Sequence, residues 1–150
     1  MAATESTSPQ LPEALTGHAG YLSVVMGQRS QDHFEQAIAA LDLRPIQYDY
    51  LATLSASGPM AQNQLAALLE VDAARIVSLT DELQARGLAE RTVDLNDRRR
   101  NLLSLTRSGR ALNAKAAKLA TVVEEALLSR LDPHERDQLR TLLRKALDFD

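Results

Sequence analysis

The sequence of 150 residues contains no cysteine, which excludes disulfide bonds, thiolate metal sites and thiol-based redox sensing. Its three histidines lie far apart in the chain, and none belongs to a pair spaced for zinc. Glycine-rich phosphate loops and the Gly-x-Ser-x-Gly nucleophile motif are also missing. We therefore expect no enzymatic activity, no cofactor and no bound metal.

Tryptophan is absent as well, and three tyrosines and two phenylalanines are the only aromatic residues, so aliphatic side chains must fill the core. No apolar run approaches the roughly 20 residues that span a bilayer, and the first ten residues lack the basic and apolar segments of a signal peptide. We expect a cytoplasmic protein without membrane contact. Residues 1–10 are polar and rich in Ser, Thr and Ala, which predicts a disordered tail before a single domain at 11–150.

Apolar residues at helical spacing, together with helix start and stop signals, predict a mostly α-helical domain. Asp72 is suited to accept from the backbone N–H groups that begin a helix, and Gly87 is suited to end one in left-handed geometry. Thr106 or Ser108 is expected to begin the helix at about 107–130. The predicted helices cover about residues 12–41, 45–57, 60–70, 72–86, 107–130 and 132–147.

One segment departs from the helical pattern. Two short runs of β-prone residues, Leu88–Val93 and Leu102–Leu105, flank a polar tip at Asp94–Arg100 that carries three arginines. Such a hairpin is typical of a wing that enters a narrow groove of DNA. The predicted fold is mainly α with a small β-hairpin wing: a winged helix-turn-helix at 45–106, with N- and C-terminal dimerisation helices at 11–41 and 107–148.

The net charge of −3 is unusual for a DNA-binding protein, but the charge is unevenly distributed. Residues 86–110 hold seven arginines and three acids, a local net charge of +4, whereas the remaining ten basic and seventeen acidic residues give −7. The local field, rather than the total charge, determines what a surface attracts. An arginine-rich loop in solvent is the alternative interpretation; contact with phosphate is the favoured one.

The terminal helices carry more apolar surface than one winged-helix core needs. A helix of about 25 residues is about 37 Å long, so its far half must find apolar cover, and a second copy of the chain is the simplest source. In such a dimer, two winged helix-turn-helix units about 34 Å apart would match a pseudo-palindromic site on double-stranded DNA. A monomeric bundle closed on itself is the alternative.

Several short motifs, in this order and at this spacing, resemble the MarR family of bacterial transcriptional regulators over about residues 12–147. They are Gln64-Leu65-Ala66, Asp72 through Leu83, Arg86-Gly87-Leu88, Asp97-Arg98-Arg99 and Leu105-Thr106-Arg107-Ser108-Gly109. The resemblance implies a dimer with interlocked terminal helices, the helix at 72–86 in the major groove and the tip at 97–100 in the minor groove. It also implies a repressor whose DNA affinity falls when a small aromatic or anionic molecule binds.

The sequence departs from the family pattern at the reading head. Glu70 stands where the family usually has glycine in the turn, so the backbone there is expected to be strained or differently shaped. Ser78 occupies a place where arginine is frequent, and Arg75 and Val77 occupy places where hydroxyl residues are frequent. We therefore expect fewer polar base contacts and more dependence on the wing and on DNA shape.

The outward face of the helix at 72–86 supplies the candidate base contacts. Arg75 is the candidate for guanine, because a guanidinium can engage O6 and N7 together. Ala74 and Val77 are small apolar residues that can contact thymine methyl groups, and Ser78 can reach a base edge or a phosphate.

In the wing tip, Arg98 is predicted to insert into the minor groove, where narrow A/T-rich segments concentrate negative potential. Asp97 is expected to hold the tip by pairing with a nearby arginine. Arg99 and Arg100 either contact phosphate or anchor the wing. Outside the wing, Gln64 is a phosphate candidate at the start of a short helix.

A pocket for an effector is predicted from His18, Tyr21, Met26 and Arg29 in the first helix and Tyr48 in the second. Tyrosine and histidine offer an apolar body with one hydrogen-bonding tip, which suits an aromatic acid or a phenol, and Arg29 would pair with an anion. Competing roles remain open: Tyr48 as a core residue, His18 and Tyr21 as dimer packing, and Arg29 as a solvent-exposed cation.

The sequence thus predicts a sequence-specific DNA-binding transcriptional regulator, a MarR-type repressor whose operator affinity a small aromatic or anionic ligand lowers. Its expected partners are double-stranded DNA with a pseudo-palindromic operator, a second copy of the chain and the effector. The alternative is a winged-helix dimer that acts by protein–protein interaction with little DNA binding, because the recognition helix is sparse in polar groups and the chain is acidic.

Overall fold

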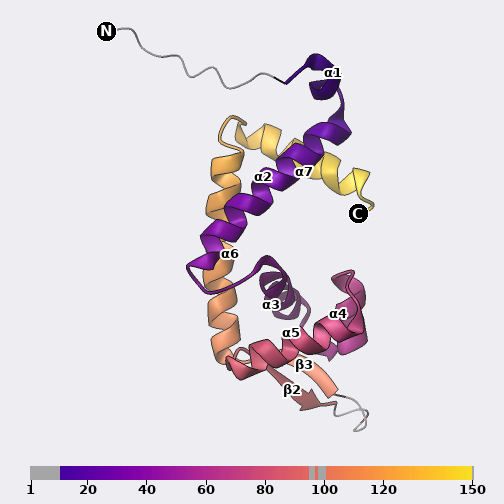
Figure 1. Ribbon diagram of the computed structural model, residues 1–150, viewed down its shortest axis with the longest axis vertical. Helices are drawn as coiled ribbons and strands as arrows, with labels where there is room; N and C mark the ends of the chain where they lie inside the picture. Colours follow the sequence, from indigo (N-terminus) through magenta and orange to yellow (C-terminus); the bar gives the residue numbers. More distant parts are fainter. Residues whose placement is uncertain (1–10, 95–96, 98–100, 150) are drawn as a thin grey trace, which may run out of the picture.

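The computed structural model describes residues 11–94, 97 and 101–149, so the predicted tail and most of the wing tip lie outside the described residues. In chain order the elements are α1 (Glu13–Thr16), α2 (Ala19–Ala39), α3 (Pro45–Ser57), β1 (Met60–Ala61), α4 (Gln62–Leu68), α5 (Ala73–Ala85), β2 (Ala89–Val93), β3 (Asn101–Leu105), α6 (Arg107–Leu127) and α7 (Pro133–Ala146) (Figure 1).

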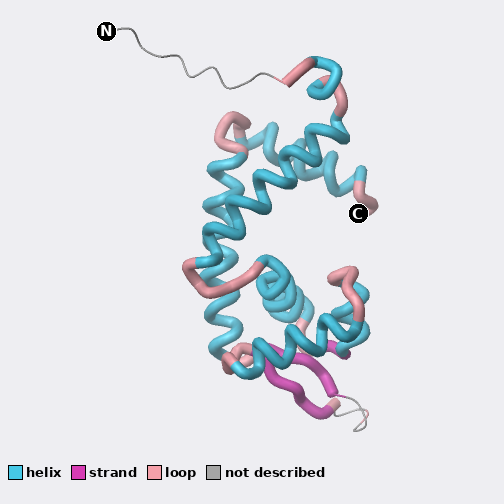
Figure 2. Tube along the Cα trace, in the orientation of Figure 1, coloured by secondary structure: helices cyan, strands magenta, loops and turns pink. Residues whose placement is uncertain are grey.

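The long helix α6 forms the spine of the molecule. Figure 1 shows α2 and α7 toward one end of α6, and α3, α4, α5 and the sheet toward the other. The strands gather at the end of the molecule opposite to α7 (Figure 2). This arrangement confirms the predicted fold class, mainly α with a small β wing. Among the described helices, none combines the length and the apolar character that a bilayer span requires.

The prediction of one continuous helix over residues 12–41 is wrong. The N–H of Gly17 donates to the carbonyl of Glu13 at 2.8 Å and closes α1 after a single turn. His18 then has extended backbone, with φ −110° and ψ 116°, before α2 begins. Glycine is a poor helix former, so apolar periodicity on both sides of Gly17 did not guarantee continuity.

The prediction that a helix begins at Met60 is also wrong, because residues 60 and 61 form the strand β1. This strand pairs antiparallel with β3, Met60 opposite Leu103 and Ala61 opposite Leu102, and the sheet has the order β1-β3-β2. Gly58, with a φ of 77°, ends α3 in a conformation that favours glycine. The Met60 side chain is buried in the core, and this burial stabilises the pairing of β1 with β3.

The core is aliphatic, as predicted, and lies where α3, α5, the sheet and the first half of α6 meet. Tyr50 is its fully buried aromatic residue, and Phe34 and Tyr48 pack against its edge. The fully buried aliphatic side chains are Ile38, Leu51, Leu65, Ile76, Leu79, Leu83 and Leu103.

A close backbone approach joins the end of α5, the wing and the start of α6. The N–H of Thr106 donates to the carbonyl of Leu88 at 3.1 Å, and the Thr106 hydroxyl donates to the carbonyl of Gly87 at 2.7 Å. That hydroxyl also accepts from the N–H of Gly109 at 3.0 Å and so caps α6. A Cβ at position 109 would lie 1.9 Å from the Leu88 carbonyl oxygen, so only glycine fits there.

We predict that Gly109→Ala destabilises the fold by about 3 kcal/mol, because the added methyl group meets backbone that cannot rotate away. Urea unfolding followed by circular dichroism measures the change. Gly20→Ala is the matched control, since a Cβ at position 20 meets nothing within 4 Å and alanine favours the helix. Equal stability of the two variants would contradict the close approach.

Candidate nucleic-acid interface

The two helices of the reading head, α4 and α5, are joined by a tight turn at Glu70. The N–H of Val71 donates to the carbonyl of Ala66 at 3.0 Å, which is the long hydrogen bond of a Schellman-type helix end. This geometry requires a left-handed residue before Val71, and Glu70 adopts it with a φ of 53°. The strain expected from a glutamate at the place of a glycine is therefore present.

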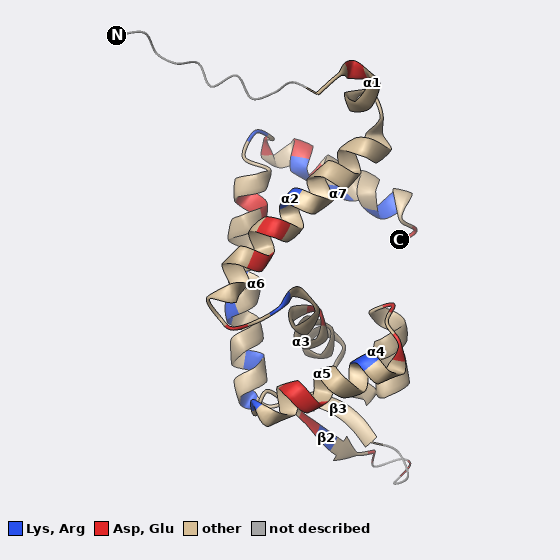
Figure 3. Cartoon of the chain, viewed as in Figure 1, with Lys and Arg blue, Asp and Glu red and all other residues tan. Residues whose placement is uncertain are grey.

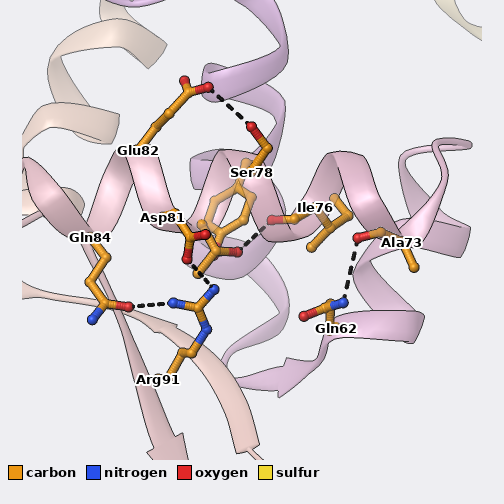
Figure 4. Close-up of polar contacts among 10 residues, drawn as sticks. Gln62, Ala73, Ile76, Ser78, Asp81, Glu82, Gln84 and Arg91 are labelled. Carbon is orange, nitrogen blue, oxygen red and sulfur yellow. Dashed lines mark hydrogen bonds and ion pairs between the residues drawn. The ribbon is translucent and has the colours of Figure 1, made fainter.

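The recognition helix α5 begins at a cap that its own sequence supplies. Asp72 Oδ1 accepts from the N–H of Arg75 at 2.7 Å, as predicted. The side chain of Gln62 donates to the carbonyl of Ala73 at 3.4 Å and so links the starts of the two helices (Figure 4). The beginning of α5 is thus held by one contact from within its turn and one from α4.

The two faces of α5 differ sharply in burial. Ile76, Leu79 and Leu83 are fully buried, which fixes the helix on the core. The opposite face is exposed and carries Ala73, Ala74, Arg75, Val77 and Ser78. The four residues predicted to touch bases therefore share one open surface.

A buried pair of hydroxyl groups connects the core side of α5 to α3. The hydroxyl of Tyr50 in α3 lies 3.0 Å from Thr80 Oγ1 in α5, and Thr80 donates its own hydrogen to the carbonyl of Ile76 at 2.7 Å. Tyr50 is therefore the donor toward Thr80. Burial raises the pKa of Tyr50, and the charge of Arg91 opposes that shift in part. The neutral, donating form of the tyrosine is thereby favoured.

The wing is attached to α5 by one arginine. Arg91 in β2 donates through Nη2 to Asp81 Oδ1 and through Nη1 to Gln84 Oε1, each at 2.6 Å (Figure 4). A guanidinium can make two such bonds at fixed geometry, which a lysine ammonium cannot. Two side-chain hydrogen bonds therefore join the wing strand to the recognition helix.

These contacts change the charge pattern inferred from the sequence. Arg91 is paired with Asp81, and Arg86 lies 3.6 Å from Asp42, so acids from outside residues 86–110 offset two of its arginines. Arg110 donates to the carbonyl of Leu105 at 2.6 Å. Acidic and basic residues are consequently mixed around the base of the wing in the described part of the chain (Figure 3).

The remaining DNA candidates fall into two groups. Gln64 Oε1 accepts from the N–H of Ala61 at 3.0 Å and helps to begin α4, and the exposed side chain keeps its amide N–H₂ as a donor group. In the wing tip, Asp97 belongs to the described residues and is half-buried. The three arginines at 98–100 lie outside the described residues, so their roles and the pairing of Asp97 with them stay predictions.

The five residues predicted to bind an effector do not line one cavity in a single chain. Met26 lines an apolar groove of about 730 Å³ between α2, α7 and the end of α6. Tyr48 packs edge-on against Phe34, with ring centroids 4.9 Å apart, and burial and the neighbouring Asp49 raise the pKa of Tyr48. Tyr21 precedes Phe34 by thirteen residues in α2, which is about 20 Å of helix. His18 and Arg29 are exposed.

A second groove, of about 720 Å³, lies between the end of α2, the start of α3 and α5, and we call it the charged groove. Its charged residues are Glu35, Asp42, Arg44, Glu82 and Arg86. The sequence did not reveal it, because Arg44 and Glu82 are 38 positions apart and no local spacing connects them. Among the described residues, no cluster of three or more acidic or histidine side chains could hold a metal ion.

Comparison with known proteins agrees with this geometry. The profile of the MarR family matches residues 41–100. The transcriptional repressor NicR of Pseudomonas putida is 33% identical over 149 residues, which are 98% of this chain and 94% of the relative. The repressor CouR, solved on a 23-mer DNA duplex, is 33% identical, with a TM-score of 0.81 over 92% of this chain and 99% of CouR.

A third relative has a known effector. BpsR of Bordetella bronchiseptica, whose DNA binding is regulated by 6-hydroxynicotinic acid, is 29% identical. Its TM-score is 0.77 over 95% of this chain and all of BpsR.

We predict that Arg91→Ala loosens the wing from α5. Loss of two charge-assisted hydrogen bonds from a largely covered side chain should lower the free energy of unfolding by about 1 kcal/mol. Amide hydrogen exchange should become faster across β2 and β3. Arg130→Ala, which changes an exposed arginine between α6 and α7, is the control. Unchanged exchange in the wing strands would show that Arg91 does not hold them.

Proposed function

Because this chain belongs to the MarR family of winged-helix transcriptional regulators, we propose that it is a repressor that binds a pseudo-palindromic operator as a homodimer. Its partners are duplex DNA and a second copy of itself, and binding to chromosomal DNA implies a cytoplasmic location. The observation that carries the proposal is the open face of α5, joined to the wing by Arg91. The CouR complex with duplex DNA supports it, as does the repressor NicR.

The DNA contacts divide by chemistry. Arg75 would read guanine, Ala74 and Val77 would meet thymine methyl groups, and Ser78 would reach a base edge. Gln64 would donate to a phosphate through its amide group. In the wing, Arg98 would enter the minor groove, with Arg99 and Arg100 at phosphates or supporting the tip and Asp97 as a structural partner.

A second copy of the chain is needed to cover the apolar surface of the terminal helices. In α7 and just beyond it, Leu142, Leu147 and Phe149 are each about 60% exposed, and the apolar groove continues that surface between α2 and α7. Exposed apolar surface of this kind marks an interaction site. A two-fold dimer would cover it and would set two recognition helices on successive turns of one DNA face.

Fluorescence anisotropy with the duplex upstream of the protein's own coding region, across a salt series, tests the proposal. We expect sequence-preferring binding whose affinity falls steeply with salt, because each neutralised phosphate releases counterions. Arg98→Ala should weaken binding and reduce the salt slope by about one phosphate equivalent. No binding at low salt would favour the alternative, a winged-helix dimer that binds protein.

We further propose that a small aromatic or anionic ligand lowers operator affinity. Regulation of BpsR by 6-hydroxynicotinic acid supports this. The proposed lining residues are His18, Tyr21, Met26, Arg29 and Tyr48. For one cavity to include all five, α2 of one chain must lie beside α3 of its partner, which a dimer built on α2 would permit.

We predict that 6-hydroxynicotinate raises the melting temperature and releases the operator duplex, whereas the uncharged 6-hydroxynicotinamide does so much less. Tyr48→Phe removes only the hydroxyl group and leaves the ring against Phe34, so it should weaken the ligand about three- to tenfold without loss of stability. An unchanged response in this variant would remove Tyr48 from the site. No response to aromatic acids would contradict ligand control.

A further inference from the structure

Three side chains converge on the carboxylate of Glu82 in α5. Arg44, at the start of α3, forms an ion pair with Glu82 Oε2. Gln47 donates to the same oxygen through Nε2 at 3.1 Å. Ser78, one helical turn earlier in α5, lies with its Oγ 3.5 Å from the other oxygen, Oε1 (Figure 4). The two carboxylate oxygens therefore face different partners.

The partners on Oε2 are themselves held in place. The Gln47 side chain is 5% exposed, and its Oε1 accepts from the N–H of Arg44 at 3.0 Å, which ties both donors to the first turn of α3. Glu82 is thus anchored from the side of the charged groove. Its remaining oxygen stays beside Ser78 on the exposed face of α5.

A serine hydroxyl has one hydrogen to donate and two lone pairs with which to accept. A carboxylate can only accept, so the contact with Glu82 uses the single hydrogen of Ser78. At 3.5 Å the contact is long, and the Ser78 side chain is exposed. With its hydrogen directed to Glu82, Ser78 presents only lone pairs to a molecule that approaches the face of α5.

We propose that Glu82 is a positioning residue that sets the polarity with which Ser78 reads DNA. In the major groove, a hydroxyl that can only accept pairs with the exocyclic amino group of adenine (N6) or cytosine (N4). Guanine O6 and N7 and thymine O4 are acceptors, and they find no donor in Ser78. The inference rests on the proposed function, because it needs the exposed face of α5 to meet DNA; Glu82 itself touches no base.

The test begins with duplexes selected by the protein from a randomised library. Every base pair of one half-site is then replaced by the other three, and dissociation constants are measured for the wild type and for Ser78→Ala. The base pair whose preference disappears in Ser78→Ala is the one that Ser78 reads. There we expect the wild type to favour the selected base pair by about three- to tenfold, the value of one net hydrogen bond, and to depend on the exocyclic amino group of its adenine or cytosine.

Glu82→Gln tests the positioning role. A carboxamide offers a donor as well as an acceptor, so Ser78 can then turn its hydrogen toward the base, and the preference should narrow to within about twofold at that pair. Asp81→Asn is the matched control, since it makes the same change one residue earlier on a side chain that contacts Arg91 and not Ser78. It should weaken binding to all four duplexes by the same factor and keep the preference.

A modified base separates the hydrogen bond from other effects. Where the selected base is adenine, purine, which lacks the N6 amino group, should cost the wild type as much affinity as Ser78→Ala does. It should cost Ser78→Ala nothing further. Where the selected base is cytosine, 2-pyrimidinone, which lacks the N4 amino group, replaces it in the same comparison.

Two results would overturn the inference: removal of the N6 or N4 amino group from the selected pair that costs the wild type no affinity, or an equal loss of affinity in Glu82→Gln at all four base pairs. Thermal unfolding shows whether Glu82→Gln is folded. If it is not, Ser78→Ala, which changes only an exposed side chain, decides the polarity together with the modified bases. Failure of the wild type to bind any duplex would instead overturn the proposed function, and this inference with it.

Discussion

The junction around Leu88 is the constraint on which the interface depends. Here the segment between α5 and β2 meets the segment between β3 and α6, and backbone hydrogen bonds join the two. Gly87 turns the chain in left-handed geometry, with a φ of 68°, and the N–H of Leu88 donates back to Leu83 in α5 at 2.8 Å. The carbonyl of Leu88 then receives Thr106, and Gly109 lies against it. Because backbone atoms make these contacts, the junction tolerates little adjustment.

Side chains extend this rigidity to the surface that would meet DNA. Tyr50 holds the middle of α5 from the core, and Arg91 joins the wing to α5. Glu82 connects the exposed face of α5 to the start of α3 through Arg44. A change in the position of α3 would therefore act on α5 directly, through Arg44 and Glu82.

Much of this fold could be predicted from short-range sequence signals. Asp72 and Thr106 cap the helices for which they were candidates, and Glu70 has the strained backbone expected of a residue in the place of a glycine. The hairpin was found because its β-prone runs are contiguous. The strand β1 was not, since two residues carry no period and their partner, β3, lies some 40 positions later. The break at Gly17 was missed because the apolar positions remain helical on both sides.

The same limit applies to the interface. Residue spacing placed Ala74, Arg75, Val77 and Ser78 on one face of a helix, and the structure gives them that open face. Residue spacing did not reveal that Asp81 and Glu82, on the next turn, would each form an ion pair with an arginine outside α5.

The sequence by itself determined the helix caps, the aliphatic core, the absence of thiol chemistry and the winged helix-turn-helix pattern. Each of these depends on residues within a few positions of one another, or on composition alone. Only the tertiary structure decided how Arg44, Arg86 and Arg91 are paired, how the wing is fixed to α5 and what anchors Glu82 beside Ser78. The three ion pairs join side chains between ten and 44 positions apart, and only packing of the whole chain brings such residues into contact.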